Sequence, residues 1–110
     1  MINHARAEAR LNHRILMVEF GANWCSDCQE LAKELDERGT SVYMKTHVDV
    51  VQVDVGEFNR NLDIARSLGI DVNQGIPAAV FIPPIAVPPA NRVGNTQILE
   101  YIHELMSLPL

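Results

Sequence analysis

Residues 15–20, Ile-Leu-Met-Val-Glu-Phe, form an almost continuous apolar segment in which apolar and polar residues do not alternate. This pattern is typical of a strand covered on both faces, because a strand with one exposed face carries polar residues at every second position. Gly21 ends the segment. The sequence therefore predicts a central strand here, with other elements packed above and below it.

Several other segments have helical patterns. Residues 3–13 contain three alanines and Leu11 among arginines and Glu8, a composition that predicts a short helix. Apolar residues recur at helical spacing over residues 25–38, 58–68 and 96–106. Gly39 and Gly69 are expected to end two of these helices, because glycine readily adopts the backbone conformation that closes a helix.

Two further segments are predicted to be strands. Residues 48–55 are rich in valine and predict a second buried strand, and residues 78–82 predict a third. Pro83 and Pro84 follow immediately and cannot donate the hydrogen bonds of a sheet. Any later strand should therefore be short and peripheral.

The length and the order of these elements indicate one domain. The chain has 110 residues, of which 47% are hydrophobic, so it can bury a core without support from a disulfide or a metal. Alternating helices and strands predict an α/β protein with helices on both faces of its sheet. We expect a single domain over residues 1–110, with residues 1–14 as an N-terminal helical extension, and a monomer.

Charge and hydrophobicity argue against two classes of partner. The net charge of −5 opposes binding to nucleic acid and to anionic lipid. The longest uncharged stretch, residues 76–90, is rich in proline and shorter than the roughly 20 residues that cross a bilayer. The first residues lack the apolar core of a secretory signal. We expect no nucleic-acid or membrane partner and a cytoplasmic location, or a periplasmic one if an export signal has been removed.

The chain has two cysteines, Cys25 and Cys28, which come just after the central strand and where the second helix begins. Free backbone N–H groups and the positive end of the helix dipole favour the thiolate form of Cys25. Cys28, one turn later on the core-facing side, is predicted to be less accessible and to form a disulfide with Cys25 by exchange. The pair is then a reversible two-electron couple.

Three other interpretations of the pair remain open. A structural disulfide is one, although a loop this short contributes only roughly 2 kcal/mol, against about 3 for a 15-residue loop. A zinc or iron–sulfur site is another, but it needs further ligands, and no spacing among the histidines brings two of them together. The third is a pair of inert thiols. Redox use is preferred, and no metal or cofactor is expected. The histidines are His4, His13, His47 and His103.

The sequence FGANWCSDC lies between a strand and a helix, and Gly75-Ile76-Pro77 follows about fifty residues later, before another strand. This combination resembles the thioredoxin superfamily, in particular its small bacterial thioredoxin-like and disulfide-isomerase-like members with a Trp-Cys-x-x-Cys site. The resemblance covers residues 15–105. It implies the thioredoxin fold, with a central mixed sheet flanked by helices on both faces and here a short or degenerate last hairpin. It also implies a thiol–disulfide oxidoreductase that reduces or isomerises protein disulfides and depends on an upstream reductant.

The resemblance implies roles for other residues. In relatives the proline matching Pro77 is cis and lies against the cysteines, and the residue before it, here Ile76, offers backbone groups to a substrate strand. Trp24 matches a tryptophan beside the nucleophile. Glu19 matches a buried aspartate that helps to move the proton of the second cysteine, and burial should raise its pKa. Val50 stands where many thioredoxins have lysine, so Glu19 lacks that charge partner. An ordinary turn proline, a core tryptophan and an exposed glutamate are the alternatives.

The residues between the cysteines depart from the family pattern. Ser26 and Asp27 replace the usual Gly-Pro, and the charge of Asp27 should oppose formation of a thiolate beside it. We predict that both residues modulate the pKa of the pair and that the couple is reducing. A redox-inactive or redox-sensing peptide-binding module is the alternative function, and a disulfide-reduction assay distinguishes the two.

Overall fold

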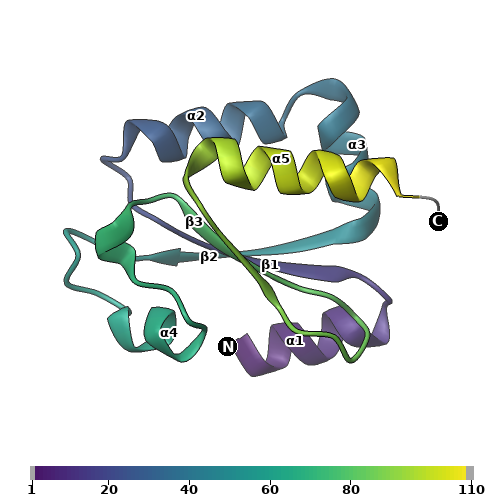
Figure 1. The fold of residues 1–110 in the computed structure, drawn as a ribbon, viewed down its shortest axis with the longest axis horizontal. Coiled ribbons are helices and arrows are strands. Elements are labelled where there is room, and N and C mark those ends of the chain that lie inside the picture. The colour runs from purple at the N-terminus through teal and green to yellow at the C-terminus, as the bar shows by residue number, and fades with distance from the viewer. Residues whose placement is uncertain (1, 109–110) are drawn as a thin grey trace.

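The computed structural model describes residues 2–108, and a four-stranded sheet forms its centre (Figure 1). The strand order is β2 (Val48–Asp54), β1 (Ile15–Gly21), β3 (Ala78–Ile82) and β4 (Ala90–Val93). β1 is parallel to β2 and antiparallel to β3, and β4 is antiparallel to β3. The predicted mixed sheet is confirmed, as is a short last strand at its edge.

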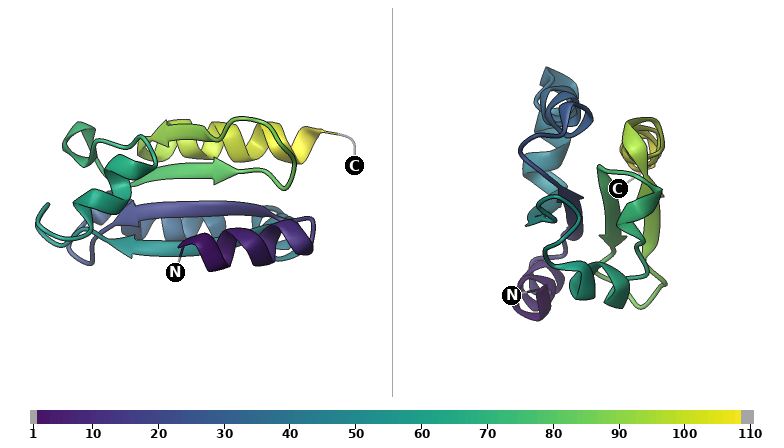
Figure 2. Two further views of the ribbon diagram at one scale, coloured as in Figure 1. Left: turned by 90° about the horizontal axis from the view of Figure 1, so that it is seen from below. Right: turned by 90° about the vertical axis from the view of Figure 1, so that its left-hand side faces the viewer.

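Helices cover both faces of this sheet, as predicted (Figure 2). On one face lie α2 (Ser26–Leu35), α3 (Arg38–His47) and α5 (Gly94–Ser107), and on the other lie α1 (Ile2–Leu11) and α4 (Leu62–Ser67). Among residues 2–108, no helix combines the length and the hydrophobicity needed to cross a membrane.

β1 is the central strand that its apolar run predicted. Leu16, Val18 and Phe20 are fully buried in the cluster that includes residues of α1 and α4. Met17 points the other way and packs with Ile102 of α5. Alternate side chains of one strand therefore join two separate apolar clusters, which explains why the run has no polar face.

β2 is an edge strand, so the prediction of a second buried strand is wrong. Val48 and Val53 are buried, but Val50 is 43% exposed. Within the described residues, only β1 pairs with β2. A valine-rich segment has the same composition at the centre and at the edge of a sheet, and the pairing of the strands decides between them.

The second helix ends earlier than predicted, at Leu35, and Gly39 does not stop it. Gly39 instead lies in the first turn of α3, a helix that the sequence analysis did not predict. Thr40 and Met44 are buried on one face of α3 at helical spacing. Gly, Thr, Ser and Val are poor helix formers, and packing against the sheet overrides that preference.

The helix predicted over residues 58–68 is also shorter than expected. α4 begins at Leu62, and Phe58 lies before it with a φ of 62°. Gly69, with a φ of 79°, does close α4, as predicted. Its N–H donates to the carbonyl of Arg66, a bond typical of a left-handed helix end.

Candidate active site

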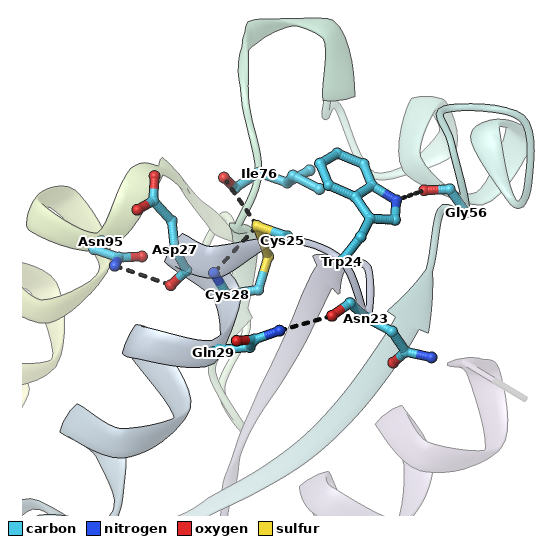
Figure 3. The surroundings of a disulfide bond; sticks show 9 residues. All are labelled: Asn23, Trp24, Cys25, Asp27, Cys28, Gln29, Gly56, Ile76 and Asn95. Carbon is cyan, nitrogen blue, oxygen red and sulfur yellow. Dashed lines mark hydrogen bonds between the residues drawn. A yellow bond between two sulfur atoms is a disulfide. The ribbon is translucent and has the colours of Figure 1, made fainter.

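Cys25 and Cys28 are joined by a disulfide at the start of α2, with their Cα atoms 5.2 Å apart (Figure 3). Cys25 is the residue that caps the helix, and its Sγ accepts a hydrogen bond of 3.1 Å from the backbone N–H of Cys28. This donor and the helix dipole stabilise negative charge on Cys25 Sγ when the disulfide opens. The predicted place of the pair, between a buried strand and a helix, is confirmed.

The two cysteines differ in exposure, and in the opposite sense to the prediction. Cys25 is only 5% exposed, whereas Cys28 is partly exposed. Cys25 Sγ faces the loop before β3 and lies 3.8 Å from the carbonyl oxygen of Ile76. Cys28 lies beside Gly21, which has no side chain to cover it. Cys28 was predicted to be less accessible because it lies on the apolar stripe of the helix. That prediction did not account for the missing side chain at Gly21, which leaves Cys28 partly uncovered.

The loop that covers Cys25 contains the predicted Ile76–Pro77 pair. The peptide bond between these residues is cis, and Pro77 is fully buried. The loop follows a short 3₁₀ helix, η1 (Val72–Gln74), and leads directly into β3. This loop places the carbonyl oxygen of Ile76 3.8 Å from Cys25 Sγ.

Trp24 is a surface residue of the site, so the alternative of a core tryptophan is wrong. Its side chain is 54% exposed, and its Nε1 donates a 2.8 Å hydrogen bond to the carbonyl of Gly56. Phe58 packs against the indole edge to face, with ring centroids 5.7 Å apart. Phe58 was not predicted as a site residue, because its spacing to Leu62 matches a helix face.

Glu19 lies in the middle of β1 and is only 7% exposed, so the alternative of an exposed glutamate is wrong. Burial raises its pKa above the ordinary value of 4.5, and a hydrogen bond with the side chain of Gln52 partly offsets that effect. Gln52 is the residue that pairs with Glu19 across β1 and β2. The missing charge partner was predicted at Val50, two residues before Gln52, and Gln52 was not predicted because the strand register was unknown.

A cavity of about 440 Å³ opens between α2, β1 and β2 on the Cys28 side of the disulfide. A side chain at Gly21 would place its Cβ 3.1 Å from Cys28 Sγ and 3.8 Å from Glu19 Oε2. The carboxyl and the sulfur therefore share the space that glycine leaves free. The residues around the cavity are Glu19, Gly21, Ala22, Asn23, Cys28, Gln29, Ala32, Gln52, Val53 and Asp54.

Ser26 and Asp27 are exposed in the first turn of α2. The backbone carbonyl of Asp27 accepts a 3.0 Å hydrogen bond from Asn95 Nδ2, which connects the start of α5 to the start of α2 (Figure 3). Asn95 Oδ1 is buried and has no hydrogen-bond partner among the described residues. No sequence signal pointed to Asn95, because the contact joins residues 68 positions apart.

Across residues 2–108, His, Cys, Asp and Glu form no group of three or more that could hold a metal ion.

Known proteins resemble this chain in both sequence and structure. A family model described as thioredoxin-like matches residues 1–84. A protein disulfide-isomerase of Hordeum vulgare is 28% identical over 91 residues, which are 81% of this chain and 16% of that protein. The chain therefore spans about a sixth of the length of this curated relative.

Two solved structures add to this comparison. A disulphide isomerase from Xylella fastidiosa Temecula1 is 27% identical, with a TM-score of 0.78 and coverage of 96% of this chain and 88% of that one. Chloroplastic thioredoxin z is 29% identical, with a TM-score of 0.64 and coverage of 96% and 90%. In both comparisons the likeness thus extends over nearly the whole chain.

Proposed function

Because this chain belongs to the thioredoxin-like family, we propose that it is a thiol–disulfide oxidoreductase that reduces or isomerises protein disulfides through Cys25 and Cys28. The observation that carries this proposal is the bond from the Cys28 N–H to Cys25 Sγ at the start of α2. It stabilises one sulfur of the disulfide as a thiolate, which is the form that attacks and leaves in thiol exchange.

The reaction follows from the positions of the two sulfurs. Cys25 thiolate attacks one sulfur of the substrate disulfide, forms a mixed disulfide and expels the other substrate sulfur as a thiolate. Cys28 thiolate then attacks Cys25 Sγ, which closes the Cys25–Cys28 disulfide and releases the second substrate sulfur. An upstream reductant returns the pair to its dithiol form.

Substrate binding is proposed to use the surface around Cys25. The carbonyl of Ile76 lies 3.8 Å from Cys25 Sγ and can accept a hydrogen bond from an extended substrate segment. Trp24 and Phe58, which are 54% and 37% exposed, offer apolar contact next to it. This arrangement suits extended protein segments.

Three residues are proposed to adjust proton transfer and redox balance. Glu19, with its raised pKa and its place beside Cys28, takes up or returns the proton of that thiol. Ser26 and Asp27, exposed beside the sulfurs, modulate the pKa of the pair, and the charge of Asp27 favours a reducing couple.

We propose that the chain works as one domain and as a monomer, in the cytoplasm, or in the periplasm if an export signal has been removed. Its partners are then protein disulfides and a reductant, with no role for nucleic acid or membranes. The net charge of −5 supports the absence of a nucleic-acid partner.

Reduction of insulin tests the proposed activity. The protein should accelerate reduction of insulin by dithiothreitol, and Cys25→Ser should abolish the acceleration because no thiolate remains to attack. Cys28→Ser should instead accumulate a mixed disulfide, visible on non-reducing gels. Ser67→Ala, at an exposed serine of α4, is a matched control that should keep the full rate. Equal rates for Cys25→Ser and the unaltered protein would show a redox-inactive or redox-sensing binding module.

A further inference from the structure

The two sulfurs of the disulfide face different surroundings. Cys25 is 5% exposed and has the carbonyl oxygen of Ile76 3.8 Å from its Sγ. Cys28 borders the cavity of about 440 Å³, a volume within the range of about 300–1,000 Å³ that is typical of small-molecule sites. Cys25 does not border that cavity. A small reagent entering the cavity therefore meets Cys28 first.

We propose that this cavity is the entry site for a small neutral or cationic thiol, which reduces the disulfide by attacking Cys28. The inference rests on the proposed function and adds the chemical class of one reductant and the atom that it attacks. Protein substrates and this small thiol would then use opposite sides of the disulfide.

The leaving group supports attack at Cys28. In thiol exchange the sulfur with the lower thiol pKa leaves faster, and the site attacked also depends on access. Cys25 Sγ accepts the N–H of Cys28 at 3.1 Å and lies at the positive end of α2, so it is the sulfur better stabilised as a thiolate. Access and leaving-group stability therefore favour the same direction of attack.

The electron balance of the reduction involves two thiols. The first thiolate attacks Cys28 Sγ, so that a new sulfur–sulfur bond forms while the Cys25–Cys28 bond breaks and its electron pair leaves on Cys25. A second thiolate attacks the sulfur of the bound small thiol and releases Cys28 as a thiolate. The two small thiols leave as their own disulfide, and the protein becomes a dithiol after taking up protons from water.

The lining of the cavity predicts the charge of the thiol. Its charged residues are Glu19 and Asp54, and no lysine or arginine is among the lining residues. Arg60 pairs with Asp54 at 3.6 Å, but both side chains of that pair are more than half exposed. The remaining polar groups include the side-chain amides of Gln29 and Gln52. An ammonium group is accommodated here, and a carboxylate is repelled.

Gly21 keeps the path to Cys28 open. A Cβ at this position would lie 3.1 Å from Cys28 Sγ, closer than side chains normally pack. Gly21 is the last residue of β1 and has no positive φ, so an L-residue fits its backbone. A larger side chain at this position should therefore narrow the cavity beside the sulfur without backbone strain.

Kinetics with three thiols of similar size test the proposal. The oxidised protein is mixed with cysteamine, 2-mercaptoethanol or mercaptoacetate at equal thiolate concentration, and the fluorescence of Trp24, the one tryptophan, follows reduction. Cysteamine should react fastest and mercaptoacetate slowest. Gly21→Val should slow cysteamine about tenfold, equal to about 1.4 kcal/mol in the barrier, and Gly21→Ala should slow it about threefold.

A control variant and identification of the cysteine that is attacked complete the test. Gly39→Ala, at a glycine with open space around it, should leave the cysteamine rate unchanged. Acid quenching and peptide mass spectrometry of the unaltered protein should locate the first adduct on Cys28. An adduct on Cys25, or Gly21 variants as fast as Gly39→Ala, would overturn the proposal.

A single turnover of pre-reduced protein with insulin separates this inference from the proposed function. Insulin reduction together with an adduct on Cys25 would reject the entry site and keep the oxidoreductase. Failure to reduce insulin would reject the oxidoreductase and, with it, the role of the cavity as a reductant site.

Discussion

Glu19 is the residue whose chemistry depends most on its surroundings. Seven residues of strand β1 form the centre of the sheet, and Glu19 is the charged one among them. Its carboxyl is buried beside Cys28 and is satisfied by Gln52, a neutral partner. Burial is the largest influence on this carboxyl and raises its pKa. A raised pKa suits a carboxyl that exchanges protons with a thiol.

The raised pKa of Glu19 predicts a stability that depends on pH. The folded chain holds the proton more tightly than the unfolded chain does, so the free energy of unfolding falls as pH rises from the ordinary value of 4.5 through the raised pKa. Glu19→Gln cannot ionise and avoids this loss. Its stability relative to the unaltered protein should therefore increase with pH across that window.

Urea unfolding at about pH 4 and about pH 8 measures this effect, because the interval spans the ordinary pKa of glutamate. The exposed Glu104→Gln serves as the control and should show no such trend. A difference between Glu19→Gln and the unaltered protein that stays constant with pH would contradict the assignment.

At the scale of elements, Arg14 joins the start of β1 to the end of α3. Its guanidinium donates to the carbonyls of Thr46 and Val48, at 2.6 and 2.9 Å, and to the carboxylate of Asp49 at 2.6 Å. The last carbonyls of a helix have no hydrogen-bond donors within the helix. The guanidinium of Arg14 supplies donors to these carbonyls from a neighbouring segment. This contact helps to explain how α3 is stable despite its unfavourable composition.

Removal of Arg14 should destabilise the fold. Arg14→Ala is expected to lower the free energy of unfolding by about 1–3 kcal/mol, because several charge-assisted hydrogen bonds are lost at a partly buried site. Arg14→Lys should recover only part of the loss, since an ammonium group cannot reproduce the planar fork.

Denaturant unfolding checks this prediction against Arg6→Ala, an exposed arginine of α1 whose removal should change stability by no more than about 0.5 kcal/mol. Equal stability of the Arg14 and Arg6 variants would show that the contact contributes nothing.

At the scale of the whole molecule, one sheet connects two apolar clusters. Ile102 of α5 belongs to one cluster and Ile70, after α4, belongs to the other. β1 and β3 contribute side chains to both, for example Val80 on one side and Phe81 on the other. Both clusters contain side chains of the same strands, so neither cluster can unfold while the sheet stays intact. The two faces should therefore unfold together.

Conservative substitutions on the two faces test this cooperativity. Ile102→Val and Ile70→Val should each lower the free energy of unfolding by about 0.5–1.5 kcal/mol, through one lost methylene. The double variant should show the sum within about 0.5 kcal/mol, because the sites do not touch. Val42→Ala, at a residue that is 62% exposed, is the control. Circular dichroism and Trp24 fluorescence should give one common transition, and two separate transitions would disprove the coupling.

Much of the fold could be predicted from local patterns. The apolar run of residues 15–20, the helical stripe of residues 96–106 and the left-handed helix end at Gly69 depend on neighbours in sequence, and all three are confirmed. The position of Cys25 at the start of a helix could also be predicted from the sequence, because strand, cysteine and helix follow one another directly. Local order along the chain determines these features.

Other features depended on which distant segments meet. The edge position of Val50 and the pairing of Glu19 with Gln52 follow from the order and register of the strands. The greater exposure of Cys28 and the contact of Asn95 with α2 follow from packing between elements. Composition and spacing do not predict these contacts, because burial and hydrogen bonding depend on atoms that come together only when the chain folds.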